Sequence, residues 1–259
     1  MTALLAAEGL GKSFRRGGVR LAAVEGASFS VDAGETLGIV GPSGSGKTTL
    51  ARLIMRLIDA DMGTLCFEGS DLFALRGKAL RATRKRFQMV FQDPLAALNP
   101  RASVADVIGD PLRIHRLSDR ASRPAAIARL LDRVGLPAAL ASRAVHEISG
   151  GQRQRVAIAR ALATKPRLIV LDEAVSALDV SVRAHILKLL VELQAESGIS
   201  YIFVSHDIAV VRAIAHRIAI MDHGRIVETG PTAQVIAAPQ SATGKALIAA
   251  VPRLMPAQD

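Results

Sequence analysis

The stretch that most constrains the fold of this chain runs from Ile39 to Thr49, where an apolar segment leads into glycines and then into a helical pattern. It matches the phosphate-loop pattern G-x-x-x-x-G-K-[ST] at every position. Glycines allow the tight bend that aims backbone N–H groups at phosphate oxygens, and the following helix adds the positive end of its dipole. The sequence therefore predicts a nucleotide site that includes Gly41, Pro42, Ser43, Gly44, Ser45, Gly46, Lys47, Thr48 and Thr49.

Two side chains of this loop have distinct chemical roles. Lys47 is predicted to reach the β and γ phosphates, and Thr48 supplies a hydroxyl suited to Mg²⁺, which takes few protein ligands and keeps water and phosphate for the rest. The alternative is a Gly/Ser turn before an ordinary helix. The order of strand, loop and helix favours the nucleotide site, because that order is what the motif requires.

The composition describes a globular chain with a basic surface. With 259 residues and 50% hydrophobic content, it can bury a substantial core, and its length suits one large domain or two closely packed lobes. A single cysteine, no run of 18 uncharged apolar residues and no basic leader predict a cytosolic chain without a secretion signal. The net charge of +10 fits nucleic acid, anionic lipid, nucleotide or a solvated face. Nucleic acid is not expected, because 3% aromatic residues offer little for base stacking.

Short apolar runs separated by glycines precede the phosphate loop, at residues 4–7, 21–24 and 27–31. This spacing predicts a small, largely antiparallel sheet of short strands.

The segments after the phosphate loop alternate between strand and helix patterns. A strand is expected at 63–67, a basic helix over 75–86, and another strand that ends at Gln92 just before a proline. From 95 to 149 the strand signal fades and helical spacing replaces it, which predicts a mostly helical insertion into an α/β domain. A hairpin over 218–227 is expected to close the sheet.

A second candidate anion site consists of Ser149, Gly150, Gly151 and Gln152, just before a predicted helix over 156–163. A helix N-terminus offers free N–H groups, and the serine adds a hydroxyl. The alternative is an ordinary helix cap, in which serine and glycine are common.

Two acids follow the apolar run at 168–171, which is typical of a strand buried on both faces. Ligands of open α/β sheets gather at the carboxyl ends of the strands. Asp172 is therefore predicted to hold Mg²⁺ through water, and Glu173 to orient or deprotonate the attacking water. The alternative is a pair of acids that cap the next helix.

Three further candidates lie outside these motifs. Asp179 closes the segment 176–179 before a predicted helix, and His206 ends a second buried strand at 201–205, where it is placed to contact the γ-phosphate or to serve a structural role. Phe14 is placed either to stack on adenine or to fill the core.

The order of these elements resembles the nucleotide-binding subunits of ABC transporters over nearly the whole chain. The motifs of that family match, in chain order, the Walker A loop at Gly41 to Thr48, the Q-loop at Gln92, the signature at Ser149 to Gln152, the Walker B aspartate at Asp172, the catalytic glutamate at Glu173, the D-loop at Ser176 to Asp179 and the switch histidine at His206.

The resemblance implies an α/β fold with a P-loop NTPase (RecA-like) core, an N-terminal antiparallel β subdomain and a helical insertion. It implies one domain over 1–259. Within it, 1–94 and 160–238 form the catalytic lobe, 95–159 the helical signature lobe, and 239–259 a C-terminal tail.

The resemblance also implies ATP and Mg²⁺ as cofactors. It assigns catalysis to Glu173, His206 and Gln92, and Mg²⁺ binding to Thr48, Gln92 and Asp172. The nucleotide contacts that it implies outside the phosphate loop are Phe14, Ser149, Gly150, Gly151, Gln152 and Asp179.

A finer resemblance is to the peptide and nickel importer subfamily, on the segments 98–101, 174–182 and 247–252. It implies an ATP-hydrolysing subunit for import of oligopeptides, dipeptides or a related small solute. Nickel import is an alternative, as are an export ATPase and a DNA-associated ABC ATPase. The chain departs from the family pattern at Ile148, where leucine is usual, and at 174–175, where Ala-Val replaces Pro-Thr.

The resemblance implies several partners. In the family, each ATP lies between the phosphate loop of one subunit and the signature of another, so a second ATPase chain, identical or related, is expected. Transmembrane permease subunits are expected directly, and an extracytoplasmic solute-binding protein indirectly. The expected location is peripheral, at the cytoplasmic face of the membrane.

Overall fold

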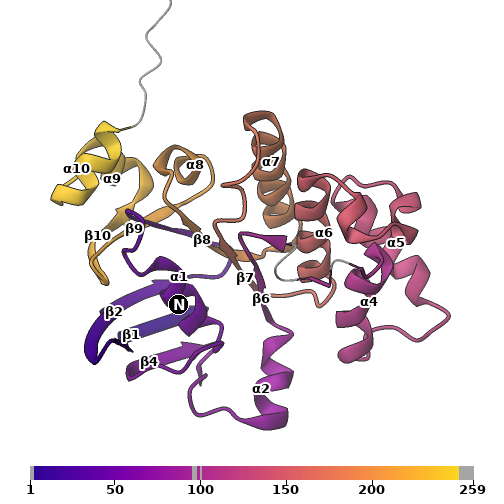
Figure 1. Cartoon of the computed structure of the whole chain (residues 1–259), viewed down its shortest axis with the longest axis horizontal. Helices are drawn as coiled ribbons and strands as arrows, with labels where there is room; N and C mark the ends of the chain where they lie inside the picture. The colour runs from indigo at the N-terminus through magenta and orange to yellow at the C-terminus, as the bar shows by residue number, and fades with distance from the viewer. Residues whose placement is uncertain (1–2, 95–97, 100, 251–259) are drawn as a thin grey trace, which may run out of the picture.

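The computed structural model describes residues 3–94, 98–99 and 101–250. Figure 1 shows the strands gathered on one side and the helices α4, α5 and α6 together on the other. The elements are, in chain order, β1 (Leu5–Arg16), β2 (Val19–Val31), β3 (Thr36–Val40), α1 (Lys47–Ile54), β4 (Met62–Phe67), β5 (Ser70–Asp71), α2 (Gly77–Arg84), β6 (Phe87–Val90), α4 (Val104–Ile114), α5 (Arg123–Arg133), the 3₁₀ helices η1 (Ala138–Ser142) and η2 (Val145–Glu147), α6 (Gly150–Leu162), β7 (Leu168–Asp172), α7 (Val180–Ser197), β8 (Ser200–Ser205), α8 (Ile208–Arg212), β9 (Arg217–Asp222), β10 (Arg225–Pro231), α9 (Thr232–Ala237) and α10 (Ala242–Ala249).

The central sheet sets the position of the candidate site. Its strand order is β10-β9-β3-β8-β7-β6, and only β10 runs antiparallel to its neighbour. Every residue of β3, β7 and β8 is buried, which explains why these strands appear in the sequence as continuous apolar runs. Val40 lies opposite Ser205, and Asp172 lies opposite Val204. The carboxyl ends of these parallel strands therefore lie side by side, and they carry the phosphate loop, the acidic pair and His206.

The N-terminal sheet is antiparallel, as predicted, with strand order β2-β1-β4-β5. The prediction of several short strands was wrong, because β1 and β2 are 12 and 13 residues long. Gly9 and Gly26 have φ values of 59° and 66° and lie at register shifts in the β1–β2 ladder. These glycines form bulges within continuous strands, whereas sequence reasoning took such glycines as strand ends.

The helical insertion is confirmed as an α4–α5–α6 unit with its own apolar packing. Val107, Ile108, Leu131 and Ile158 belong to one buried cluster that continues to the central sheet. The predicted start of the last helix at 156 was wrong: α6 begins at Gly150. Gly150 and Gly151 have low helix propensity and hid the first turn of α6, although Ser149 and Gln152 have the spacing of a capping box.

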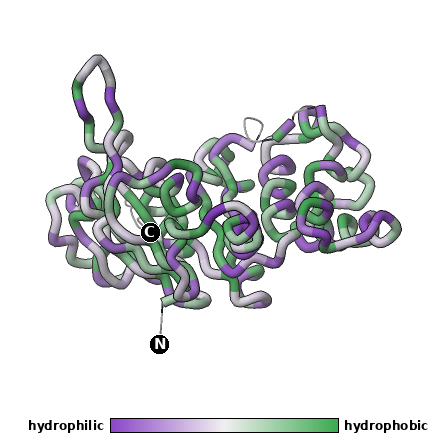
Figure 2. Tube along the Cα trace, turned by 90° about the horizontal axis from the view of Figure 1, so that it is seen from below, coloured by the Kyte–Doolittle hydropathy of each residue, from purple (hydrophilic) through white to green (hydrophobic). Residues whose placement is uncertain are grey.

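The second buried cluster lies between the two sheets and includes α1. Figure 2 shows hydrophobic segments concentrated in the strand-rich part, while hydrophilic and hydrophobic segments alternate along the helical part. Two predicted features extend beyond the described residues: the lobe boundary at 95 and the end of the tail at 251–259. Over the ranges that the structure describes, no helix is long and apolar enough to cross a membrane.

Candidate nucleotide-binding site

The phosphate loop is shaped by glycines that no other residue can replace without displacement. Gly46 caps α1 with a φ of 101°. A Cβ atom there would lie 2.1 Å from the carbonyl oxygen of Ala23, and a Cβ atom on Gly41 would lie 2.2 Å from the carbonyl oxygen of Met221. The loop is therefore enclosed by β2 and β9. Their backbone carbonyl groups lie so close to Gly46 and Gly41 that no side chain fits at these two positions.

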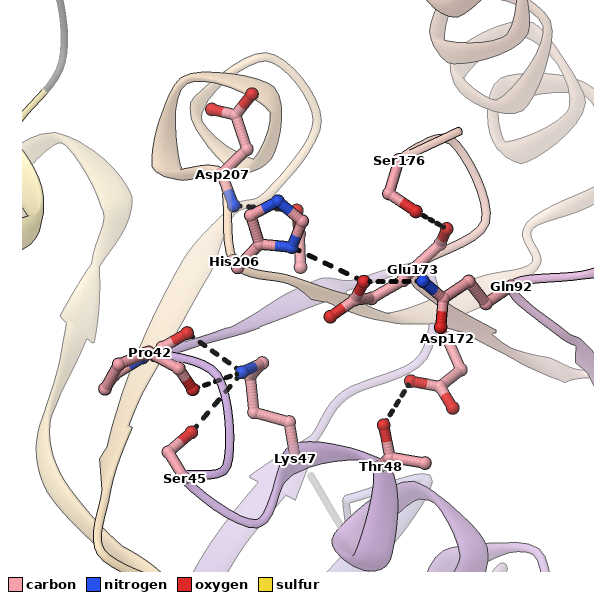
Figure 3. A network of polar contacts seen from close by, with 12 residues as sticks. Pro42, Ser45, Lys47, Thr48, Gln92, Asp172, Glu173, Ser176, His206 and Asp207 are labelled. Carbon is pink, nitrogen blue, oxygen red and sulfur yellow. Dashed lines mark hydrogen bonds and ion pairs between the residues drawn. The ribbon is translucent and has the colours of Figure 1, made fainter. Parts of the chain in front are cut away.

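Lys47 lies inside this loop and is 5% exposed. Its Nζ donates hydrogen bonds to the carbonyl oxygens of Gly41 at 2.9 Å and Pro42 at 2.8 Å (Figure 3). Burial lowers the pKa of Lys47, while the carboxylates of Glu173 and Asp172 oppose this shift. The ammonium is thus already desolvated and oriented at the wall of the cavity.

Asp172 ends β7 and is 5% exposed. Its Oδ1 accepts a hydrogen bond from Oγ1 of Thr48 at 3.3 Å. Burial raises the pKa of Asp172, and the bond from Thr48 acts against this. A divalent cation here would favour the ionised carboxylate, so the pair fits Mg²⁺ chemically. In the described part of the chain, no group of three or more His, Cys, Asp or Glu side chains is arranged to hold a metal ion, so such an ion would need phosphate and water ligands as well.

Glu173 is held by residues that follow two other strands, β6 and β8. Its Oε2 accepts a hydrogen bond from Nε2 of Gln92 at 3.1 Å and lies 3.4 Å from Nδ1 of His206. Its backbone has a φ of 47°, an unfavourable left-handed conformation for a residue with a Cβ. The N–H of Glu173 donates to the carbonyl oxygen of Val204 on β8. The left-handed backbone at Glu173 directs its carboxylate away from the carboxylate of Asp172. The two acids therefore differ in burial and in hydrogen-bond partners.

Lys47, Thr48 and Glu173 border a cavity of about 400 Å³. The residues that line it are Ala23, Ser43, Gly44, Gly46, Lys47, Thr48, Thr49, Gln92 and Glu173. Ala23 was missed by sequence reasoning, and no local signal could have found it, because its role depends on the packing of β2 against the phosphate loop.

The predicted signature residues lie elsewhere, on the helical part. Ser149 caps α6: its Oγ accepts from the N–H of Gln152 at 3.2 Å, and Oε1 of Gln152 accepts from the N–H of Ser149 at 3.0 Å. This is a capping box, so the helix-cap interpretation is confirmed as local geometry. A Cβ on Gly151 would lie 2.6 Å from Cγ1 of Val182, because α6 packs against α7 here. None of these residues lines the cavity.

Asp179 and Phe14 are also outside the cavity lining. Asp179 caps α7, accepting from the N–H of Val182 at 2.9 Å, and this bond together with one from Ser181 holds the pKa of Asp179 below its usual range. Phe14 is 45% exposed on β1, with Nζ of Lys12 at 5.8 Å from its ring centroid. The core interpretation of Phe14 was therefore wrong, and adenine stacking stays a prediction.

A phosphate loop, a buried aspartate and a neighbouring glutamate at the carboxyl edge of a parallel sheet define a nucleotide-binding protein of the P-loop class. The ABC transporter family matches residues 24–176, and the chain belongs to this family. It is 52% identical over 236 residues to "Probable peptide ABC transporter ATP-binding protein y4tS" of Sinorhizobium fredii, covering 91% of this chain and 67% of that protein.

The chain is also 49% identical over 236 residues to "Glutathione import ATP-binding protein GsiA" of Escherichia coli, covering 91% of this chain and 38% of that protein. It therefore spans little more than a third of that relative.

Solved structures of the same family have the same fold. CbiO1 from Clostridium perfringens, described as part of the ABC transporter complex cbiONQ, has a TM-score of 0.79 and 29% identity, covering 91% of both chains. The ATP-binding cassette MJ0796, solved as a dimer bound to ADP and Pi, has a TM-score of 0.81 and 28% identity, covering 88% of this chain and 98% of that one. The predicted ABC ATPase fold is confirmed.

Proposed function

We propose that this chain binds ATP with Mg²⁺ and hydrolyses it to drive the import of a peptide or a related small solute. The observation that carries this proposal is the position of Glu173, whose carboxylate lines the same cavity as Lys47 and Thr48 and is contacted by both Gln92 and His206. A carboxylate that faces a phosphate-binding loop and is oriented by two neighbours is suited to direct a water molecule at a terminal phosphate.

The residues of the cavity then divide the work. Lys47 exchanges its loop carbonyl partners for phosphate oxygens, and the backbone N–H groups of residues 43–48 bind the remaining phosphate charge. Thr48, Asp172 and Gln92 would hold Mg²⁺, which neutralises phosphate charge when bound. Glu173 orients the attacking water and accepts its proton, and His206 keeps Glu173 in place from the opposite side.

The rest of the site is proposed to come from a second ATPase chain, identical or related. Ser149 to Gln152 and Asp179 lie outside the cavity lining, and MJ0796 was solved as a dimer. In this arrangement Phe14 stacks on adenine, and the 95–159 lobe of each chain covers the nucleotide of the other.

The names of the relatives support the substrate class: y4tS is described as a probable peptide transporter protein and GsiA as a glutathione import protein. We therefore favour a peptide-like solute over nickel, and transport over a DNA-associated role. Permease subunits in the membrane, with a solute-binding protein outside, complete the proposed importer. The chain then lies at the cytoplasmic face of the membrane.

The test is Glu173→Gln, which keeps the shape of the side chain and removes its basicity. We expect ATP hydrolysis to fall by at least about a hundredfold, while ATP affinity stays within about twofold, because general-base catalysis contributes about 10²- to 10⁴-fold. Phosphate release and equilibrium nucleotide binding measure the two quantities. Glu192→Gln on the exposed face of α7 is the matched control. Normal hydrolysis by the Glu173 variant would contradict the assignment.

A further inference from the structure

Arg183, in the first turn of α7, contacts two loops that come from different strands. Its Nη2 donates a hydrogen bond to the carbonyl oxygen of Leu178 at 3.1 Å. Its Nη1 lies 3.3 Å from Oδ2 of Asp207, the residue that directly follows His206. One planar group therefore joins the segment 176–179, which follows β7, to the turn that follows β8.

Asp207 is itself firmly placed. Its Oδ1 accepts from the N–H groups of Ala209 at 2.9 Å and Val210 at 3.3 Å, as the cap of α8. Its own N–H donates to Oγ of Ser205. The oxygen that caps α8 and the oxygen that meets Arg183 are different atoms, so the carboxylate carries both contacts at once. A shift of Arg183 would therefore act on the turn that presents His206.

The other end of this connection returns to Glu173. Oγ of Ser176 donates to the carbonyl oxygen of Glu173 at 2.9 Å, and the carboxylate of Glu173 meets His206 at 3.4 Å (Figure 3). The polar contacts thus form a closed circuit that runs from Glu173 through Ser176, along the chain to Leu178, across Arg183 to Asp207, and back through His206. Contacts in such a network affect one another, so each member restrains the rest.

The shape of the Arg183 guanidinium, and not only its charge, fits its contacts. Its side chain is 26% exposed, and its Nε is buried with no hydrogen-bond partner in the described structure. Each Nη serves a different loop. Lysine has a single nitrogen on a flexible stem and would lose the rigid link between them, even though it keeps the positive charge. The geometry favours a role in spacing the two loops over simple charge neutralisation.

We propose that Arg183 is a positioning residue that couples the position of the 176–179 segment to the orientation of His206 against Glu173. Arg183 does not line the nucleotide cavity, so it acts through these neighbours. A partner chain that displaces the segment 176–179 would change the orientation of His206 through Arg183. This inference rests on the proposed function, because it requires that Glu173 and His206 take part in hydrolysis.

The test is a double-mutant cycle on the full chain with ATP and Mg²⁺. Arg183→Met is expected to lower kcat about tenfold and to leave KM for ATP within about twofold, the scale of coupling between contacting groups. In a His206→Ala background the same substitution is expected to change kcat by less than about twofold. Arg212→Met, an exposed arginine of α8, is the matched control and is expected to leave kcat unchanged.

Arg183→Lys separates positioning from stability. It keeps a cation beside Asp207, so thermal stability is expected to return toward that of the natural chain while kcat stays low. Two outcomes would overturn the coupling through Arg183 and leave the proposed function standing. One is a normal kcat in Arg183→Lys, and the other is an equal effect of Arg183→Met in the natural chain and in the His206→Ala variant. If His206→Ala leaves kcat unchanged, both the coupling and the proposed role of His206 are overturned. If Arg183→Met fails to fold, the lysine variant carries the cycle.

Discussion

Two helix N-termini of this molecule have similar chemistry and different surroundings. α1 begins at the phosphate loop, where Lys47 is 5% exposed and the carbonyl oxygen of Ala23 closes over Gly46. α6 begins at Gly150, where Ser149 and Gly150 are exposed and the serine hydroxyl is occupied by its own capping box. Both can bind an anion in principle. Only the first is built into a cavity of its own chain.

The difference fits the proposal that two chains share each nucleotide site. We expect the enclosed site to bind phosphate by itself, because Lys47 and Asp172 are already buried and oriented there. The exposed end of α6 offers N–H groups to whatever covers it, and within the described chain nothing does. We therefore expect substitutions at α1 to affect nucleotide affinity directly, and substitutions at α6 to affect turnover when two chains meet.

The largest effect is expected from Lys47→Ala. The ammonium faces the cavity from a buried position, so its removal should raise the Kd for ATP about a hundredfold and abolish measurable hydrolysis. Isothermal titration with ATP and a phosphate-release assay test this. Lys188→Ala, on the exposed face of α7, is the control. If the Lys47 variant keeps the ATP affinity of the natural chain, the enclosed site at α1 does not depend on this ammonium, and its assignment as the phosphate-binding site is contradicted.

An intermediate effect is expected from Ser149→Ala, compared with Ser103→Ala. Each serine caps a helix through a capping box, on α6 and α4 respectively. Each variant should therefore lose about 1 kcal/mol of stability in thermal or denaturant unfolding. Only Ser149→Ala should lower ATP turnover, by about tenfold to a hundredfold, because its hydroxyl would contact a charged phosphate in the paired site.

The same pair of variants tests whether the site is divided. ATP affinity of the isolated chain should be unchanged in both, since neither serine lines the cavity. Equal turnover of the two variants, or a specific activity of the natural chain that stays constant on dilution, would contradict a site shared between chains.

The smallest effect is expected at Glu228, on the hairpin whose turn supports the phosphate loop through a bond from Gly224 N–H to the carbonyl of Ser45. Glu228 accepts hydrogen bonds from the N–H groups of Gln240 and Ser241 and from the hydroxyl of Ser241. Burial raises the pKa of Glu228, but these hydrogen bonds outweigh it and leave the pKa below its usual value.

A depressed carboxylate pKa stabilises the fold above the unfolded value of about 4.3, and this contribution disappears as the pH falls through the folded value. We expect Glu228→Gln to be less stable than the natural chain at pH 7, by no more than about 1 kcal/mol. The gap should begin to narrow only as the pH falls below about 4.3, and it should disappear once the pH is below the folded pKa of Glu228. Chemical denaturation at several pH values measures it, and a gap that widens on acidification would contradict the sign.

Much of the candidate site follows from local patterns. Three predicted features end or directly follow a buried strand: the phosphate loop, Asp172 and Glu173. A strand of a parallel sheet is apolar along its whole length, so these strands and the residues at their ends can be recognised in the sequence. The helical insertion was found because its apolar residues recur with the helical period. The continuity of β1 and β2 was missed, because a glycine bulge and a glycine turn look alike in sequence.

The sequence by itself determined which chemical groups the protein carries and which short segments are candidates for phosphate binding, because those properties depend on neighbours within a few residues. Only the tertiary structure decided which groups meet. Ala23 reaches the phosphate loop, Arg183 reaches Asp207 at a separation of 24 residues, and the N-terminus of α6 stays outside the cavity. These outcomes depend on how sheets and helices pack, where side-chain volume and burial over the whole domain outweigh local preference.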